Sequence, residues 1–120
     1  MPKTLLVIDD DVLHRESLSY LLSAEGYEVR CVADGAEALA ALQFGMSPDL
    51  ILLDLKMPGM SGWQFRQEQR RQTAWAAVPV LLLTGDPEAD RQAREIGAVE
   101  WIRKPIEISA LLAALRRLCP

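Results

Sequence analysis

Five polar side chains follow segments of strand-like sequence, and their types suit phosphate chemistry. These residues are Asp9, Asp10, Asp54, Thr84 and Lys104. Clustered carboxylates repel each other unless a hard, oxygen-seeking cation such as Mg2+ neutralises them. A carboxylate beside such a cation can attack a phosphoryl group, whose oxygens a lysine ammonium and a threonine hydroxyl can bind. The five residues therefore indicate a pocket for Mg2+ and phosphate.

The elements that would position these side chains are short strands of a parallel sheet. Residues 5–8, 50–53 and 80–83 are continuously apolar, as expected for strands buried on both faces. Residues 28–32 and 99–103 are of mixed polarity and suit the edges of the sheet. Because the carboxyl ends of parallel strands meet at one rim, we expect the five polar residues to lie together.

Stretches of helical spacing alternate with these strands. The last has apolar residues at positions 108, 111, 112, 115 and 118, which form one stripe. Asp34, Ser61 and Asp86 are predicted to cap the second, third and fourth helices, with Pro87 opening the fourth. The fourth helix should be loosely held, because its apolar stripe consists only of residues 89, 93 and 96.

The alternation predicts an α/β fold with a doubly wound, five-stranded parallel sheet and five helices. The strand order 2-1-3-4-5 allows right-handed crossovers and also places the second and fifth strands at the edges of the sheet. In such sheets ligands bind beyond the carboxyl ends of the strands, at the switch point between strands 1 and 3. The predicted site for ligands thus coincides with the acids.

Composition excludes several other classes of protein. The 120 residues suffice for one hydrophobic core, so residues 1–120 are interpreted as a single domain. The net charge of −4 argues against a nucleic-acid surface. No apolar run is long enough for a membrane span, and no signal peptide is recognisable, so we expect a cytoplasmic protein. Cys31 and Cys119 lack metal-type or redox-type spacing and are interpreted as structural.

The order of these motifs resembles that of the receiver domains of bacterial two-component response regulators. The likeness extends from residue 5 to residue 118, and the spacings between the motifs agree as well. The matching motifs are the acid pair Asp9–Asp10, the segment 52–59 around Asp54, Thr84 with Gly85 after it, and Lys104 with Pro105.

The resemblance implies a flavodoxin-like fold and a phosphoacceptor function. A sensor histidine kinase or a phosphotransfer protein would donate a phosphoryl group from its phosphohistidine to Asp54, with Thr84 and Lys104 assisting. Mg2+ would be held by Asp10, Asp54 and the backbone carbonyl of Lys56, with Asp9 acting mainly through water. The Lys104–Pro105 peptide bond would be cis, a geometry that X–Pro bonds adopt at modest cost.

The resemblance also implies a conformational switch. Thr84 and Trp101 would change position, and the fourth helix, fifth strand and fifth helix would form the output face. Trp101 suits equally well a half-buried tryptophan of an edge strand without a signalling role. The signal would pass to a downstream effector protein or to an effector domain outside this chain. We expect no binding of nucleic acid or membrane and no independent enzymatic turnover.

Two other functions stay open at this point. A phosphatase resembling the haloacid-dehalogenase superfamily would use Asp9 as nucleophile and Asp11 as acid/base. It needs a further acidic motif that residues 106–120 do not supply, and it leaves Asp54 without a role. A receiver-like module that binds partners without phosphorylation is the second, although every expected site residue is present. Asp11 otherwise suits the first turn of a helix, where the helix dipole favours an acid. His14 is predicted to be a solvated helix residue away from the site.

Overall fold

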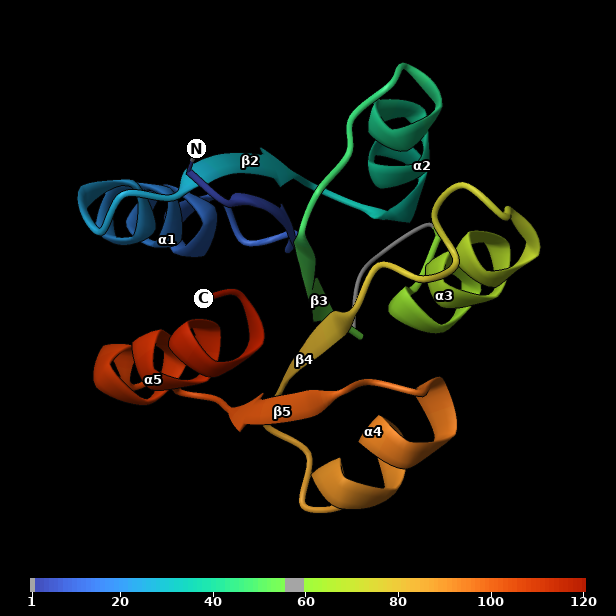
Figure 1. Cartoon of the computed structure of the whole chain (residues 1–120). Coiled ribbons are helices and arrows are strands. Elements are labelled where there is room, and N and C mark those ends of the chain that lie inside the picture. The colour runs from blue at the N-terminus through green and yellow to red at the C-terminus, as the bar shows by residue number, and fades with distance from the viewer. Residues whose placement is uncertain (1, 56–59) are drawn as a thin grey trace.

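The computed structural model describes residues 2–55 and 60–120. In this part of the chain, five parallel strands form one sheet in the predicted order β2-β1-β3-β4-β5 (Figure 1). The elements in chain order are β1 (Thr4–Ile8), α1 (Val12–Ala24), β2 (Glu28–Val32), α2 (Gly35–Gln43), β3 (Leu50–Asp54), α3 (Gly62–Arg71), β4 (Val80–Thr84), α4 (Ala89–Ile96), β5 (Glu100–Arg103) and α5 (Ile108–Leu118).

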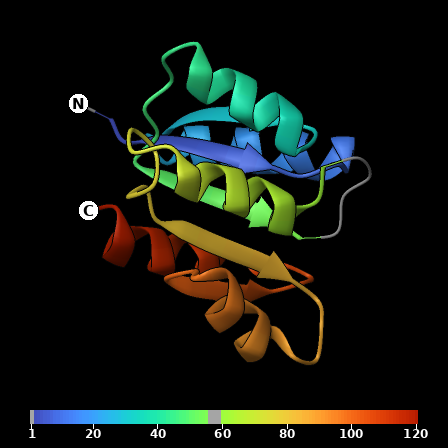
Figure 2. The ribbon, with the colours of Figure 1, turned by 90° about the vertical axis from the view of Figure 1, so that its right-hand side faces the viewer.

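The helices cover both faces of the sheet. Helices α1 and α5 pack on one face, where they meet alternate strand residues such as Leu5, Val7 and Leu52. Helices α2, α3 and α4 pack on the other face, against residues such as Leu6 and Leu53. Figure 2 views this second face, and the strands all point toward the same side of the molecule. Their carboxyl ends therefore form one rim, as predicted.

Burial separates the central strands from the edges. All residues of β3 and β4 are buried, whereas β2 and β5 are partly exposed. This confirms the prediction that continuously apolar segments form central strands and segments of mixed polarity form the edges. Strands β3 and β4 each extend one residue further than predicted, so that Asp54 and Thr84 are their last residues. Among the described residues, no helix has the length and apolar character needed to cross a membrane.

Two of the three predicted helix caps are confirmed. The side chains of Asp34 and Ser61 accept backbone N–H groups at the starts of α2 and α3. The predicted cap Asp86 is wrong, because α4 begins only at Ala89 and Glu88 occupies the cap position. Asp86 instead accepts the N–H of Glu88 at 2.8 Å, and its carbonyl accepts the N–H of Ala89, so a turn precedes the helix.

Candidate functional site

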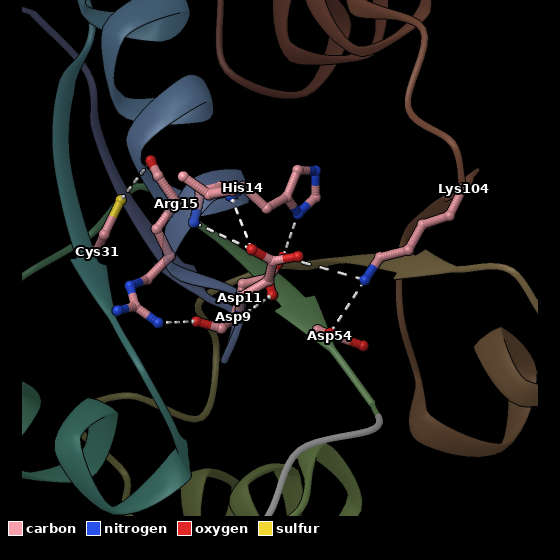
Figure 3. Close-up of polar contacts among 8 residues, drawn as sticks. Asp9, Asp11, His14, Arg15, Cys31, Asp54 and Lys104 are labelled. Carbon is pink, nitrogen blue, oxygen red and sulfur yellow. Dashed lines mark hydrogen bonds and ion pairs between the residues drawn. The ribbon is translucent and has the colours of Figure 1, made fainter.

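The rim at the carboxyl ends of the strands brings the predicted polar residues together. Asp9 and Asp10 follow β1, Asp54 ends β3, Thr84 ends β4, and Lys104 follows β5. The ammonium of Lys104 lies 3.0 Å from Asp54 Oδ2 and 4.0 Å from Asp9 Oδ2 (Figure 3). The Lys104–Pro105 peptide bond is cis, as predicted.

Three carboxylates converge at this rim. Asp9, Asp10 and Asp54 each offer an oxygen, and these oxygens all lie within 4.8 Å of one another. Asp9 is completely buried, Asp54 is 7% exposed, and Asp10 is exposed. Like charges this close repel strongly where water is scarce, and a single ammonium cannot offset three of them. The arrangement therefore favours binding of a cation.

Asp9 is held rigidly by the start of α1. Its Oδ1 accepts the backbone N–H of Asp11 at 3.0 Å, and Arg15 donates to its backbone carbonyl at 2.7 Å. Its Oδ2 contacts Nδ1 of His14, which points toward the acids in Figure 3. The prediction that His14 lies away from the site is therefore wrong.

The position of His14 follows from the way α1 begins. Asp11 is the N-cap, and its side chain accepts the N–H groups of Leu13 and His14 at 3.0 and 3.2 Å. This cap starts the helix immediately after the acid pair, so the first turn lies beside the rim. The signal in the sequence was the short separation between Asp9 and His14. Asp11 thus has a structural role, as interpreted, but as the N-cap of α1 and not as a residue of its first turn.

Two cavities meet at Asp54 and Lys104. One, of about 560 Å³, is lined on the acid side by Asp9, Asp10 and His14. The other, of about 420 Å³, is lined on the opposite side by residues of the loop after β4 and of α4. Asp54 can thus contact one ligand on the acid side and another group on the side of Thr84.

Thr84 connects the rim to α4. It is 6% exposed and lines the second cavity. Its hydroxyl donates a hydrogen bond to Gln92 Oε1 at 3.0 Å and accepts one from the N–H of Asp86 at 3.1 Å. Sequence reasoning missed Gln92. Its signal was a polar residue beside Ala89 and Ala93 on the apolar stripe of α4, where a polar group needs a partner.

A close backbone contact fixes the start of α3 against the end of β3. A Cβ atom on Gly62 would lie 2.8 Å from the carbonyl oxygen of Asp54 and 2.8 Å from Cα of Leu55. Only glycine allows this approach. Lys56, whose backbone carbonyl is predicted to bind the metal, lies outside the described residues.

Trp101 links β5 to α4. Its ring packs at the margin of the core on the α4 face, and its Nε1–H donates to Asp90 Oδ1 of α4 at 2.7 Å. The guanidinium of Arg103 lies 5.0 Å from the ring centroid. Trp101 is therefore a half-buried residue of the edge strand, a position compatible with both roles left open by the sequence, and it contacts the helix assigned to the output face.

The thiol of Cys31, on β2, packs against α1. Its Sγ contacts the carbonyl of Arg15 at 3.6 Å (Figure 3). Burial raises the pKa of Cys31, the charge of Arg15 opposes this rise, and Asp9 adds to it. Cys31 and Cys119 are both free, in agreement with their structural interpretation.

Comparison with known proteins assigns the family. Residues 5–116 match the model of the response regulator receiver domain. The chain belongs to this family. The match includes all five rim residues of the receiver domain, from Asp9 to Lys104.

Relatives and solved structures agree with this assignment. The receiver domain is 37% identical over 120 residues to the DNA-binding dual master transcriptional regulator RpaA of Synechocystis sp., covering 98% of this chain and 49% of RpaA. It is 36% identical to the chemotaxis protein CheY4 of Vibrio cholerae, with a TM-score of 0.89 and coverage of 98% and 99%. The response regulator TrrA of Thermotoga maritima, solved with Mg2+-BeF, is 32% identical, with a TM-score of 0.84 and coverage of 97% and 98%. The chain thus spans about half the length of RpaA.

Proposed function

We propose that this receiver domain accepts a phosphoryl group on Asp54 from the phosphohistidine of a sensor histidine kinase or a phosphotransfer protein. The observation that carries the proposal is the position of Asp54. It lies between two cavities, with the ammonium of Lys104 3.0 Å from its Oδ2. A carboxylate in this position can contact a cation on the acid side and a phosphoryl group on the side of Thr84.

The acid side fits Mg2+. Its donor set consists of carboxylate oxygens, which this hard cation prefers, and the oxygens lie within 4.8 Å of one another. Asp10 and Asp54 would hold the ion, together with the backbone carbonyl of Lys56. Both oxygens of Asp9 already have partners within the protein, which supports a contribution through water. Bound Mg2+ would offset the charge of the acids and of the phosphoryl oxygens.

The transfer exchanges one bond to phosphorus for another. An oxygen of the Asp54 carboxylate forms an O–P bond while the P–N bond of the phosphohistidine breaks. The electron pair stays on the imidazole nitrogen, which then takes up a proton. Lys104 offsets negative charge on the phosphoryl oxygens, and the hydroxyl of Thr84 donates a hydrogen bond to one of them.

The output face in this proposal consists of α4, β5 and α5. Thr84 contacts α4 through Gln92, and Trp101 contacts α4 through Asp90. Movement of Thr84 toward a phosphoryl group would change both contacts and shift the population of α4 conformations. The signal would pass to an effector protein or to an effector domain outside this chain.

The geometry gives less support to a phosphatase that uses Asp9. A nucleophilic carboxylate needs an accessible oxygen, yet Asp9 is completely buried and contacts His14 and the backbone of Asp11. The side chain of Asp11, the acid/base of that mechanism, accepts N–H groups at the start of α1. We therefore expect the protein to keep its phosphoryl group as a signal rather than act as an independent enzyme.

The decisive experiment is incubation with acetyl phosphate and Mg2+, followed by intact-mass measurement. The wild-type protein should gain one phosphoryl group as an acid-stable, base-labile adduct. Asp54→Asn should gain none, because its amide is nearly isosteric but not nucleophilic. The matched control is Asp49→Asn, which makes the same change just before the opposite end of β3, at an exposed residue that accepts the N–H of Thr4.

Each other outcome of this experiment selects a different function. Full phosphorylation of Asp54→Asn would show that another residue is the acceptor. Continuous release of phosphate that Asp9→Asn abolishes and Asp54→Asn preserves would identify a phosphatase. A wild-type protein that gains no adduct from acetyl phosphate would be a binding module.

A further inference from the structure

Gln92 accepts a hydrogen bond from the hydroxyl group of Thr84, which the proposed switch requires. The Thr84 hydroxyl donates to Gln92 Oε1, and its oxygen accepts the N–H of Asp86. Both Thr84 and Gln92 line the cavity of about 420 Å³ that also contains Asp54 and Lys104. The hydroxyl therefore borders the cavity of the acceptor while its proton is engaged by α4.

A threonine hydroxyl has a single proton to donate. The oxygens of an ionised phosphoryl group only accept hydrogen bonds, so Thr84 cannot donate to such a group and to Gln92 with the same proton. We propose, on the basis of the function proposed above, that Gln92 is a positioning residue that holds Thr84 in its unphosphorylated arrangement. The phosphoryl group on Asp54 competes with Gln92 for this proton.

This competition acts on the amino-terminal half of α4, which contains Gln92. The helix has no side-chain hydrogen bond at its N-cap, and it buries only the small face of Ala89, Ala93 and Ile96. Loss of the bond to Gln92 removes a polar contact from the first half of α4.

The carboxyl end of α4 has separate contacts with α3. Arg66 Nε donates to the carbonyl of Ile96 at 2.9 Å, and Arg66 Nη2 donates to that of Gly97 at 3.2 Å. Arg70 Nη2 also donates to the carbonyl of Ile96, at 2.8 Å. None of these bonds involves Thr84. Phosphorylation should therefore shift the amino-terminal half of α4 while its carboxyl end stays in place.

The test is the variant Gln92→Met, because methionine has a similar length and helix propensity but is only a weak hydrogen-bond acceptor. Beryllofluoride with Mg2+, which mimics a phosphoryl group on a carboxylate, is titrated while amide chemical shifts are recorded. Removing one competing hydrogen bond should tighten the apparent affinity of beryllofluoride by about 2- to 10-fold. Gln92→Ala should tighten it as well, which guards against an effect peculiar to methionine.

Two controls separate competition from a general effect on the helix. Arg94→Met changes an exposed residue of α4 that does not line the cavity, and it should leave the affinity unchanged. In a Thr84→Ala background, adding Gln92→Met should have no further effect, because the contested proton is already absent. Without beryllofluoride, the amides of the first half of α4 in Gln92→Met should shift toward their positions in the wild-type complex.

The outcomes distinguish this inference from the function on which it rests. If wild-type protein binds beryllofluoride and Gln92→Met binds it equally or more weakly, the competition is wrong and the phosphoacceptor function stands. A gain that persists in the Thr84→Ala background also overturns the competition. If wild-type protein neither binds beryllofluoride nor accepts a phosphoryl group, the proposed function and this inference both fail.

Discussion

The acid side of the rim and the α4 side are held by different kinds of contact. Strands β1 and β3, which deliver Asp9 and Asp54, lie in the interior, and the residues of β3 from Leu50 to Leu53 have no exposed surface. Helix α4 has a small buried face and hydrogen bonds from Thr84, Trp101 and α3. Close packing resists displacement, whereas hydrogen bonds can be exchanged for others of similar energy. We therefore expect the acids of the proposed phosphoacceptor site to stay in place and α4, part of the proposed output face, to move.

The largest expected effect is on the packed side. Leu53→Ala would leave a cavity in the fully buried part of β3 and should lower the free energy of unfolding by about 2–5 kcal/mol. Asp90→Asn weakens only the exposed hydrogen bond to Trp101 and should cost about 1 kcal/mol or less. Urea denaturation of both variants measures the two costs. If both variants lost the same free energy of unfolding, the acid side and the α4 side would not differ in how firmly they are held.

The sequence predicted the packed side well because its signals are local. Continuous apolar runs suffice to identify β1, β3 and β4, and the mixed runs identify the edges. Parallel strands then place Asp9, Asp54 and Lys104 at one rim without any knowledge of loop geometry. Both the strand order and the convergence of these residues follow from such patterns.

The contacts on the α4 side were less predictable because they depend on where helices begin. Asp86 looks like a cap in sequence, but a turn delays α4 until Ala89. That delay fixes which residue of α4 meets Thr84, and Gln92 was accordingly missed. His14 was misplaced for a similar reason, since its contact with Asp9 depends on the start of α1.

The next effect concerns the contacts between α3 and the carboxyl end of α4. Arg66 is 8% exposed, and burial, with the charge of Arg70 nearby, lowers its pKa. Arg66→Met would leave the carbonyls of Ile96 and Gly97 without this donor and should cost about 1–3 kcal/mol. Hydrogen exchange should accelerate most at the carboxyl end of α4.

Arg71→Met is the matched control for this change. Arg71 lies on the same helix, but its ion pair with Glu68 is exposed. Surface pairs of this kind contribute little, so exchange in α4 should stay unchanged. If Arg66→Met and Arg71→Met have the same effect on α4, the hydrogen bonds of Arg66 do not hold that end of the helix.

A smaller effect is expected when the acid side loses one carboxylate. The Mg2+ affinity of Asp10→Ala should fall by about tenfold or more, because an oxygen ligand is lost. In metal-free buffer the same variant should be slightly more stable, because repulsion with Asp9 and Asp54 is relieved. Asp34→Asn is the control, since it removes a carboxylate that caps α2 and does not line this cavity, and asparagine is also a good N-cap. Unchanged Mg2+ affinity in Asp10→Ala, measured by calorimetric titration, would contradict the metal site.

The smallest expected effect concerns the packing of β2 against α1 beside Asp9, which the thiol of Cys31 reports. Burial raises the pKa of Cys31, and Arg15 opposes this rise. Because the folded-state pKa lies above the unfolded one, the contribution to stability is complete below the unfolded pKa of about 8.5 and is lost as pH rises through the folded pKa. In a Cys119→Ala background, the pH midpoint of Cys31 alkylation should therefore lie above that of free cysteine.

A second change separates burial from charge as causes of this midpoint. Arg15→Met removes the positive charge that favours the thiolate, so the midpoint should rise further. The midpoint is the relevant quantity because burial also slows alkylation sterically at every pH, which changes the rate without moving the midpoint. An Arg15→Met midpoint that stays at or below that of free cysteine would mean that water reaches β2 beside Asp9. The packing of α1 on β2 would then add little to the fixed half of the rim, and the contrast between a fixed and a movable half would rest on packing of the central strands alone.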